Sequence, residues 1–550
     1  MARKPVKKRT TYRNSNIVKK KPESSNKSAE IELSNNSNVK ESISEEKLLN
    51  SETLVTKTIE ESEDVSALQI QAETKKVKIL IAASEGMPFV TTGGLGEVVG
   101  SLPKAIMKEN SEQFDVRVVL PLYESISIED RQQMEFLGHF NVQLAWRQQY
   151  CGVFRTTRNG VIYYFIDNEY YFKRANVYGH YDDGERFAFF SKAVLDSIIL
   201  MDFHPDIIHC HDWQTALVPI YLNYVYGHLH AKSIFTIHNI EYQGKYDFHI
   251  ISDVFGLPSE SRFVLEYEKC VNLMKGAIEC SNQVNTVSPT YAWELRDDQY
   301  AKGLANIIRK NEFKMRGILN GIDIESYNPD TDSSLFIKYN KNSIENKKVN
   351  KSELQKLVHL PVKEKTPLIA IVTRLVSHKG LDLVKEMIEQ LLNEEVQVVV
   401  LGIGDQQYED YFRWLQSKYP EKVATLLCFN SDLARKVYGG ADFFLMPSKS
   451  EPCGLAQMIS SRYGTVPIVR AVGGLRDTIK DCSIGEGNGF VFERYSANDL
   501  LDTIRRGFNV YYNENDWNQL VKWIMSIDFS WEKSAREYED MYLQLFYNGN

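Results

Sequence analysis

Two glycine pairs in this chain could bring a phosphate group close to the backbone. Gly93 and Gly94, in the stretch TGGLGEVVGSLPKA, follow a strand-like run and open a predicted helix, and Gly473 and Gly474 in VGGLRDT repeat the pattern. Without Cβ atoms these residues let a ligand approach, and the free N–H groups and dipole of a helix N-terminus favour an anion. Many turns between a strand and a helix carry two glycines for packing alone, so both interpretations stay open.

Two cations and a carboxylate follow predicted strands in the second half of the chain. Arg374 and Lys379, in TRLVSHKG, come after the apolar run TPLIAIV and could neutralise a diphosphate, Arg as a fork and Lys as a point charge. Glu451, in SKSEPCGL, follows another apolar run and could accept hydrogen bonds from sugar hydroxyls. The alternatives are two solvated loop cations and a carboxylate that caps the next helix.

Polar pairs also end two predicted strands in the first half of the chain. His211 and Asp212 end the run that reads CHDW, and His238 and Asn239 end the run that reads TIHN. A single histidine is more often structural than catalytic, but two polar pairs at one sheet edge favour a site. Their spacing does not match metal-binding motifs such as H-E-x-x-H, so we expect no bound metal.

These residues can meet only if parallel strands place their carboxyl ends along one edge. Near-continuous apolar runs such as KVKILIAAS, FDVRVVLPL and VQVVVLG alternate with helical patterns, as in sheets covered on both faces. The alternation predicts an α/β chain with two doubly wound, Rossmann-like domains and a ligand cleft between them. We expect these domains at 76–330 and 366–525, a polar linker or surface excursion at 331–365, and an amphipathic helix within 526–550.

The composition gives no reason to expect nucleic acid or membrane as a partner. The 550 residues carry a net charge of −8, and 43% of them are hydrophobic. No apolar run reaches the roughly 18 residues of a membrane span, and the N-terminus lacks a secretory h-region.

Seven scattered cysteines without a C-x-x-C pair indicate a reducing compartment, which we expect to be the cytoplasm. Residues 1–75, rich in Ser, Asn, Lys and Glu, are expected to form a disordered, charged tail.

From about residue 76 onward, the chain closely resembles the family of bacterial glycogen synthases and plant starch synthases. The resemblance is carried by motifs that include TGGLGEVVGSLPKA, HDWQTALVPIYL, FTIHNIEYQG, VTRLVSHKGLDL, GGADFFLMPSKSEPCGL and RYGTVPIVRAVGGLRDT. Members of this family are ADP-glucose-dependent, retaining glucosyltransferases with the GT-B fold. The resemblance implies an N-terminal domain on the acceptor side, a C-terminal domain on the donor side, and a last helix that packs back on the N-terminal domain.

The resemblance also implies roles for the residues at the strand ends. Arg374 and Lys379 match the basic pair on the donor diphosphate, and Glu451 matches the carboxylate that serves the donor glucosyl group. His238 and Asp212 match polar groups beside the transferred sugar, and these five are the expected catalytic residues. No metal or other cofactor is implied. Further contacts are expected to ADP-glucose from Thr91, Gly93, Gly94, Phe429, Cys453, Gly454, Leu455, Gly473 and Gly474, and on the acceptor side from Glu97 and Asn239.

Four positions depart from the residues that are usual in the family. Thr91 stands where the family has a lysine that touches the donor–acceptor region, so a charge is replaced by a hydroxyl. Losing one charge-assisted contact could cost on the order of 1.5–3 kcal/mol. Glu97 replaces an aspartate, Tyr327 replaces a tryptophan, and Phe429 replaces a tyrosine that stacks on adenine, which a phenyl ring can still do. These changes bear on efficiency and acceptor preference and leave the fold unaffected.

The resemblance therefore predicts a glycogen (starch) synthase that transfers glucose from ADP-glucose to the non-reducing end of an α-1,4-glucan with retention of configuration. Two alternatives stay open. One is a glucan-binding or regulatory homologue that has lost transfer, which Thr91 favours. The other is a related GT-B glucosyltransferase that uses UDP-glucose. The expected partners are ADP-glucose and a glycogen primer, with no nucleic acid and no membrane, and the oligomeric state does not follow from the sequence.

Overall fold

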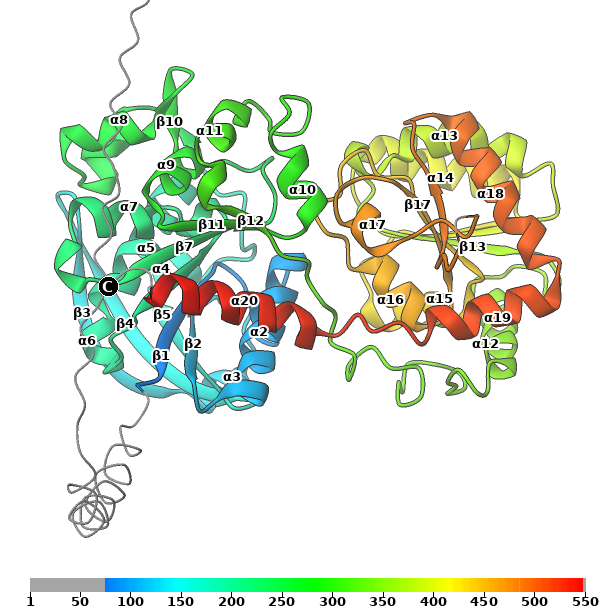
Figure 1. Cartoon of the computed structure of the whole chain (residues 1–550), viewed down its shortest axis with the longest axis horizontal. Coiled ribbons are helices and arrows are strands. Elements are labelled where there is room, and N and C mark those ends of the chain that lie inside the picture. Colours follow the sequence, from blue (N-terminus) through cyan, green and yellow to red (C-terminus); the bar gives the residue numbers. More distant parts are fainter. Residues whose placement is uncertain (1–74, 484, 548–550) are drawn as a thin grey trace, which may run out of the picture. The chain divides into compact units, whose positions relative to one another are not determined.

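Two large β-sheets, each built around parallel strands, organise the part of the chain that the computed structural model describes, residues 75–483 and 485–547 (Figure 1). The tail predicted at 1–75 lies outside the described residues except for Lys75. The N-terminal sheet has the order β12-β11-β7-β6-β1-β2-β5-β4-β3. Its strands are β1 (Val77–Ala82), β2 (Phe114–Pro121), β3 (Glu135–Leu144), β4 (Arg147–Arg158), β5 (Val161–Asp167), β6 (Ile207–His211), β7 (Lys232–Ile237), β11 (Gln283–Thr286) and β12 (Met315–Gly317).

The C-terminal sheet is parallel throughout, in the order β15-β14-β13-β16-β17-β18. Its strands are short and buried, as β13 with the sequence LIAIV illustrates, because helices cover both faces. They are β13 (Leu368–Val372), β14 (Gln397–Leu401), β15 (Val423–Leu426), β16 (Phe443–Met446), β17 (Val466–Arg470) and β18 (Phe490–Phe492).

Both sheets reverse their strand order at one point. In the C-terminal sheet the first strand, β13, lies between the second, β14, and the fourth, β16. In the N-terminal sheet β1 lies between β2 and β6. Ligands of doubly wound proteins bind outside the carboxyl ends of the strands at such a reversal. The sheets confirm the predicted doubly wound α/β architecture. One addition to the prediction is the antiparallel pair β3–β4 at the edge of the N-terminal sheet.

Helices connect and cover the strands. In the N-terminal domain the longer ones are α2 (Gly94–Asn110), α5 (Asp183–Asp196), α7 (Leu217–Tyr224), α9 (Leu273–Cys280), α10 (Pro289–Glu294) and α11 (Ala305–Lys310). In the C-terminal domain they are α12 (Glu345–Leu357), α13 (Leu381–Leu391), α14 (Gln406–Lys418), α15 (Ser431–Gly440), α16 (Ala456–Arg462), α17 (Gly473–Thr478), α18 (Ala497–Tyr511) and α19 (Glu514–Ile524). No helix of the described residues combines the length and apolar character needed to cross a membrane.

The last helix, α20 (Trp531–Tyr547), belongs to the core of the N-terminal domain. It packs against α2 and β1, and in Figure 1 the red α20 lies beside the blue α2. Tyr538 and Tyr542 have no exposed surface, and Trp531 is buried in the same hydrophobic cluster. The aromatic stripe seen in the sequence is therefore the face with which α20 closes this domain.

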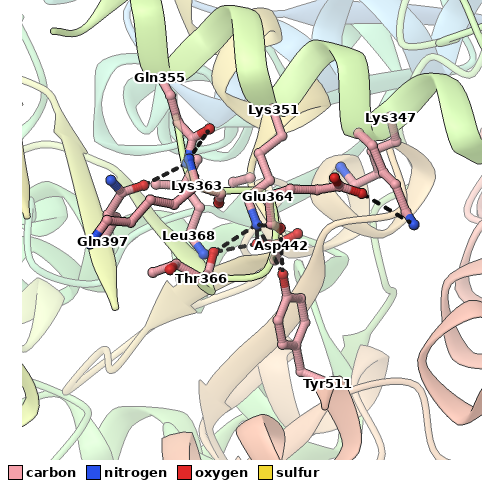
Figure 2. Close-up of polar contacts among 12 residues, drawn as sticks. Lys347, Lys351, Gln355, Lys363, Glu364, Thr366, Leu368, Gln397, Asp442 and Tyr511 are labelled. Atoms are coloured by element: carbon pink, nitrogen blue, oxygen red, sulfur yellow. Dashed lines mark hydrogen bonds and ion pairs between the residues drawn. The ribbon is translucent and has the colours of Figure 1, made fainter. Parts of the chain in front are cut away.

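The segment predicted as a linker or surface excursion, 331–365, contains the helix α12, which packs on α15 of the C-terminal domain. The buried face of α12 is polar, and Lys347, Lys351 and Gln355 follow one another along it (Figure 2). Lys351 Nζ lies 2.7 Å from Asp442 Oδ2 and donates to the carbonyl oxygen of Thr366 at 2.7 Å. A helix that docks through lysines looks like solvated chain in a hydropathy pattern, which is why the sequence suggested a linker here.

Candidate functional site

Apart from Glu97, which lies in the first turn of α2, the predicted site residues follow strands at the carboxyl edges of the two sheets. Thr91, Gly93 and Gly94 come after β1, Asp212 after β6, and His238 and Asn239 after β7. In the C-terminal sheet the segments after β13, β15, β16 and β17 carry the remaining residues. These are Arg374 and Lys379, then Phe429, then Glu451, Cys453, Gly454 and Leu455, and lastly Gly473 and Gly474. The strands at the two order reversals thus supply the cations, the carboxylates and the first glycine pair.

Lys379 and Glu451 form a buried ion pair at the reversal point of the C-terminal sheet. Lys379 Nζ lies 2.9 Å from Oε1 and 2.8 Å from Oε2 of Glu451, which is only 6% exposed. The hydroxyl of Ser448 donates to Oε2 at 2.8 Å. Burial alone would raise the pKa of Glu451, but Lys379 and Ser448 together hold it below its usual value. Glu451 is therefore an anion at neutral pH, and it is not the cap of the next helix, α16.

Arg374 lies on the same loop as Lys379 and is exposed. Burial first, and then the charges of Lys379 and Arg374, lower the pKa of His378 on that loop. Both cations thus act on one imidazole. Among the described residues the Arg374 side chain has no ion-pair partner, so an anionic ligand from solvent can reach it. Phe429, after β15, is 82% exposed and presents a ring to solvent.

Asp212 has an unusual backbone conformation, with φ 56° and ψ −179°. This region is almost confined to glycine, and a non-glycine residue in it costs of order 1–3 kcal/mol. The carboxylate accepts hydrogen bonds from the backbone N–H groups of His238 at 2.8 Å and Asn239 at 3.4 Å. Burial raises the pKa of Asp212 to about 7, although these two bonds oppose the shift. The strained turn therefore places a carboxylate that titrates near neutral pH beside His238.

His238 is paired with His211, whose Nδ1 lies 2.8 Å from His238 Nε2. Burial lowers the pKa of His238 to about 3 and that of His211 well below its ordinary value. Both rings are therefore neutral at pH 7 and act as hydrogen-bonding groups, not as cations.

A buried carboxylate that the sequence reasoning missed supports the first glycine loop. Glu85, three residues beyond β1, is 4% exposed and accepts a hydrogen bond from the backbone N–H of Thr92. Burial raises its pKa, while hydrogen bonds from Thr92 and Tyr178 act in the opposite direction. An acidic residue within the apolar stretch AASEGMPF was the available signal. Thr91 itself is exposed, and its hydroxyl donates to the carbonyl oxygen of Gly93 at 3.2 Å.

Gly93 and Gly94 differ from Gly473 and Gly474 in what surrounds them. A Cβ atom on Gly93 would meet no heavy atom within 4 Å, so this position is open. On Gly473 it would lie 2.0 Å from the carbonyl oxygen of Glu451, and on Gly474 2.2 Å from that of Cys453. The second pair is thus required by close packing against the Glu451–Cys453 backbone. The N–H of Gly473 donates to Glu294 Oε1 at 3.0 Å, a contact that the sequence did not indicate.

Glu97, expected on the acceptor side, accepts a hydrogen bond from the hydroxyl of Tyr327 at 3.2 Å. Burial raises its pKa, and the bond from Tyr327 opposes that shift. The guanidinium of Arg435 lies 4.6 Å from the centre of the Tyr327 ring. Two of the four departures from the family pattern, Glu97 and Tyr327, therefore contact each other.

The described residues contain no group of three or more His, Cys, Asp or Glu side chains placed to hold a metal ion. Catalysis without a metal remains a prediction. Lys379 and Arg374 carry positive charge on the loop after β13, and Arg470 at the end of β17 donates to the carbonyl oxygen of Lys449 at 3.0 Å.

Comparisons with known proteins identify the family of this chain. The family model described as the starch synthase catalytic domain matches residues 78–310, and glycosyl transferases group 1 matches residues 355–519. Two proteins named glycogen synthase, from Desulforamulus reducens and Bacillus anthracis, are 46% identical to this chain over 482 and 477 residues. These matches span 86% and 85% of this chain and all of each relative.

Solved structures show the same relationship. The catalytic domain of starch synthase IV from Arabidopsis thaliana, bound to ADP and acarbose, is 33% identical with a TM-score of 0.80 and covers 86% of this chain and all of its own. Sucrose-phosphate synthase from Thermosynechococcus elongatus, at 18% identity and a TM-score of 0.56 over 86% of this chain and all of its own, shares the fold alone. From its motifs, its two doubly wound domains and these relatives, the chain belongs to the glycogen synthase and starch synthase family of GT-B glycosyltransferases.

Proposed function

We propose that this chain transfers glucose from ADP-glucose to the non-reducing end of an α-1,4-glucan, with retention of configuration at the anomeric carbon. The observation that carries the proposal is the buried pair of Lys379 and Glu451, at 2.8 Å, beside the exposed Arg374. Membership of a glucosyltransferase family supports the reaction type. The related starch synthase solved with ADP and acarbose supports ADP as the nucleotide product.

In the proposed reaction, the charges that develop on ADP and on the sugar are opposite in sign to those of the residues assigned to them. Cleavage of the bond between glucose and phosphate leaves negative charge on ADP and makes the anomeric carbon oxocarbenium-like. Lys379 and Arg374 would stabilise the charge on the diphosphate. Glu451 and Asp212, as carboxylates, would stabilise the positive charge on the sugar. Because Lys379 and Arg374 would supply two positive charges to the diphosphate, we propose that the step needs no metal.

Retention follows in the proposal from attack on the face that ADP leaves. The leaving phosphate oxygen takes the proton of the acceptor hydroxyl, the bond between the acceptor oxygen and the anomeric carbon forms, and ADP departs with the electron pair. No enzyme nucleophile takes part. We place the reaction in the cytoplasm, a compartment that suits seven free cysteines.

Thr91 favours a second candidate, a glucan-binding homologue that no longer transfers glucose. Its hydroxyl already bonds to the carbonyl oxygen of Gly93, so the loop carries no side-chain cation at this position. We favour the enzyme, because Lys379, Arg374, Glu451 and His238 are all present at the strand ends. A transferase that uses UDP-glucose is the third possibility, and it is tested by the choice of donor.

The test is ADP release by the purified full chain with ADP-glucose and glycogen, with UDP-glucose in parallel. We expect release that depends on the primer and is faster with ADP-glucose. Glu451→Gln should lower it by at least about 100-fold, since one oriented electrostatic contact is worth two to three decades. A wild-type chain that binds glycogen but releases no nucleotide from either donor would contradict the proposal. If Thr91→Lys then restored release, the defect would lie at that loop.

A further inference from the structure

Three imidazole rings lie in a row in the N-terminal domain, and their protons can be assigned from the contacts of the described residues. His209 and His211 are both on β6 with no exposed surface, and His238 follows β7 and is partly exposed. The ring centres of His209 and His211 are 4.3 Å apart, and those of His211 and His238 are 5.2 Å apart. At neutral pH each ring has one N–H donor and one acceptor nitrogen.

The position of the proton on His209 is fixed by a series of hydrogen bonds that begins at Tyr542 on α20, in which each group donates to the next. Thr236 donates its only hydroxyl proton to Asn285 Oδ1, so its oxygen must accept the bond from His209 Nε2, at 2.6 Å. His209 Nδ1 is then an acceptor, and the hydroxyl of Tyr542 donates to it at 2.8 Å. His209 is therefore held in the Nε2–H form and packs against His211 without a hydrogen bond between them.

The proton of His211 can lie on Nδ1 or on Nε2, and the Nδ1 position costs less free energy. His211 Nε2 is buried and has no hydrogen-bond partner among the described residues, while Nδ1 faces His238 Nε2 at 2.8 Å. A proton on Nε2 would leave a buried N–H group without an acceptor among the described residues, which is rarer and costlier than an unused lone pair. The proton of His211 therefore lies on Nδ1, which donates to His238 Nε2.

This assignment decides what His238 offers to a ligand. Because Nε2 of His238 accepts a hydrogen bond, its own proton lies on Nδ1. Nδ1 has no partner among the described residues and is not among their buried, unpaired atoms, so it reaches the surface of the site. The backbone N–H of His238 is held at the same time by Asp212 Oδ1, at 2.8 Å.

We infer that His211 is a positioning residue that fixes the Nδ1–H form of His238, so that His238 donates a hydrogen bond to a sugar oxygen of the substrate. The inference rests on the proposed transfer of glucose for the identity of the ligand. The assignment of the protons rests only on the contacts above. His238 then orients the sugar and takes no proton in the reaction.

The test compares three variants by NMR and by kinetics. His211→Leu removes the donor, whereas His211→Asn keeps an N–H near the place of Nδ1. Tyr542→Phe is the matched control, because it removes one hydrogen bond from the same buried cluster and leaves the pair of His211 and His238 intact. Long-range proton–nitrogen spectra of chain labelled with ¹⁵N-histidine report which nitrogen carries the proton. The His238 signals are assigned by their loss in His238→Asn.

We expect His238 to be protonated on Nδ1 in wild type, His211→Asn and Tyr542→Phe, and to populate Nε2–H in His211→Leu. For His211→Leu we expect kcat to fall about tenfold, the value of one oriented hydrogen bond, with KM for ADP-glucose changed less than about threefold. His211→Asn should recover most of this loss, and Tyr542→Phe should stay within about twofold of wild type.

A wild-type His238 protonated on Nε2, or an unchanged proton position in His211→Leu, would overturn the inference. So would an equal loss of kcat in Tyr542→Phe and His211→Leu, which would mean that packing alone matters. If wild type released no nucleotide from any sugar donor, the proposed function would fail. The spectra would still decide the position of the proton.

Discussion

Replacing Lys379 by methionine should lower both the stability of the C-terminal domain and the rate of ADP release, and a second substitution at Glu451 should restore only the stability. The substitution leaves Glu451, which is 6% exposed, as a buried carboxylate whose ion pair at 2.8 Å has gone. Breaking a buried pair costs about 3–5 kcal/mol, and we take the lower end, about 3 kcal/mol, because 16% of the Lys379 side chain is exposed. For a domain of this size that corresponds to a fall in Tm of roughly 6–12 °C.

The double variant Lys379→Met/Glu451→Gln is the informative partner. It removes the unpaired negative charge of Glu451. The glutamine amide oxygen can still accept the hydrogen bond that Ser448 donates to Glu451 in wild type. We therefore expect most of the lost Tm to return, while ADP release stays at least about 100-fold below wild type in both variants, because the cation for the diphosphate is missing.

The loss of stability in Lys379→Met should also depend on pH. In wild type the pKa of Glu451 lies below its ordinary value of 4.5, so its contribution to stability is present above that value and disappears as the pH falls through the lowered one. Without Lys379, the hydrogen bond from Ser448 opposes burial only in part, so we expect burial to raise the pKa of Glu451 and the destabilisation to grow as the pH rises from 5 to 8. Calorimetry or thermal denaturation at both pH values measures this. A single variant as stable as wild type, or a double variant no more stable than the single one, would refute the reasoning.

Four further predictions concern other residues of the chain. Because burial raises the pKa of Asp212 to about 7, kcat/KM of wild type should rise through pH 7 as this carboxylate ionises, and the rise should vanish in Asp212→Asn. Burial lowers the pKa of Lys347 to about 7, so the unfolded chain binds more protons between pH 7 and about 10.5, and stability should increase over that range. In Lys347→Met the increase should be lost, as scanning calorimetry between pH 7 and about 10.5 would show. Gly473→Ala should displace the Glu451 loop and lower both Tm and ADP release. Gly93→Ala should leave Tm unchanged and raise KM for ADP-glucose about tenfold if phosphate approaches that backbone.

The strands and the residues at their ends could be predicted because both depend on local sequence. A strand covered on both faces, such as β13 with LIAIV, is an apolar run, and the chemistry of a parallel sheet follows directly after such runs. That is why Lys379, Glu451, Asp212 and His238 were found at carboxyl edges of the two sheets. The family resemblance added the roles that position alone could not supply.

The features that the sequence did not reveal depend on partners far along the chain. α12 looked like a linker because the partners of its buried lysines, Asp442 for Lys351 and Thr465 for Lys347, lie about 90 and 120 residues further on. The position of the proton on His211 depends in the same way on the packing of β6 beside β7, which brings His238 to its Nδ1. The partners of such buried polar and charged side chains are brought together only by packing. Their pairing therefore leaves no periodic pattern in the sequence.

The most direct test of the central claim is the linkage formed when the chain is given ADP-[¹³C]glucose and a linear α-1,4-glucan. We predict one ADP released for each labelled glucose incorporated, and carbon spectra that show the label as new α-1,4-linked residues at non-reducing ends. Free labelled glucose as the main product, β-linked label, or no incorporation despite binding of the glucan would contradict the account.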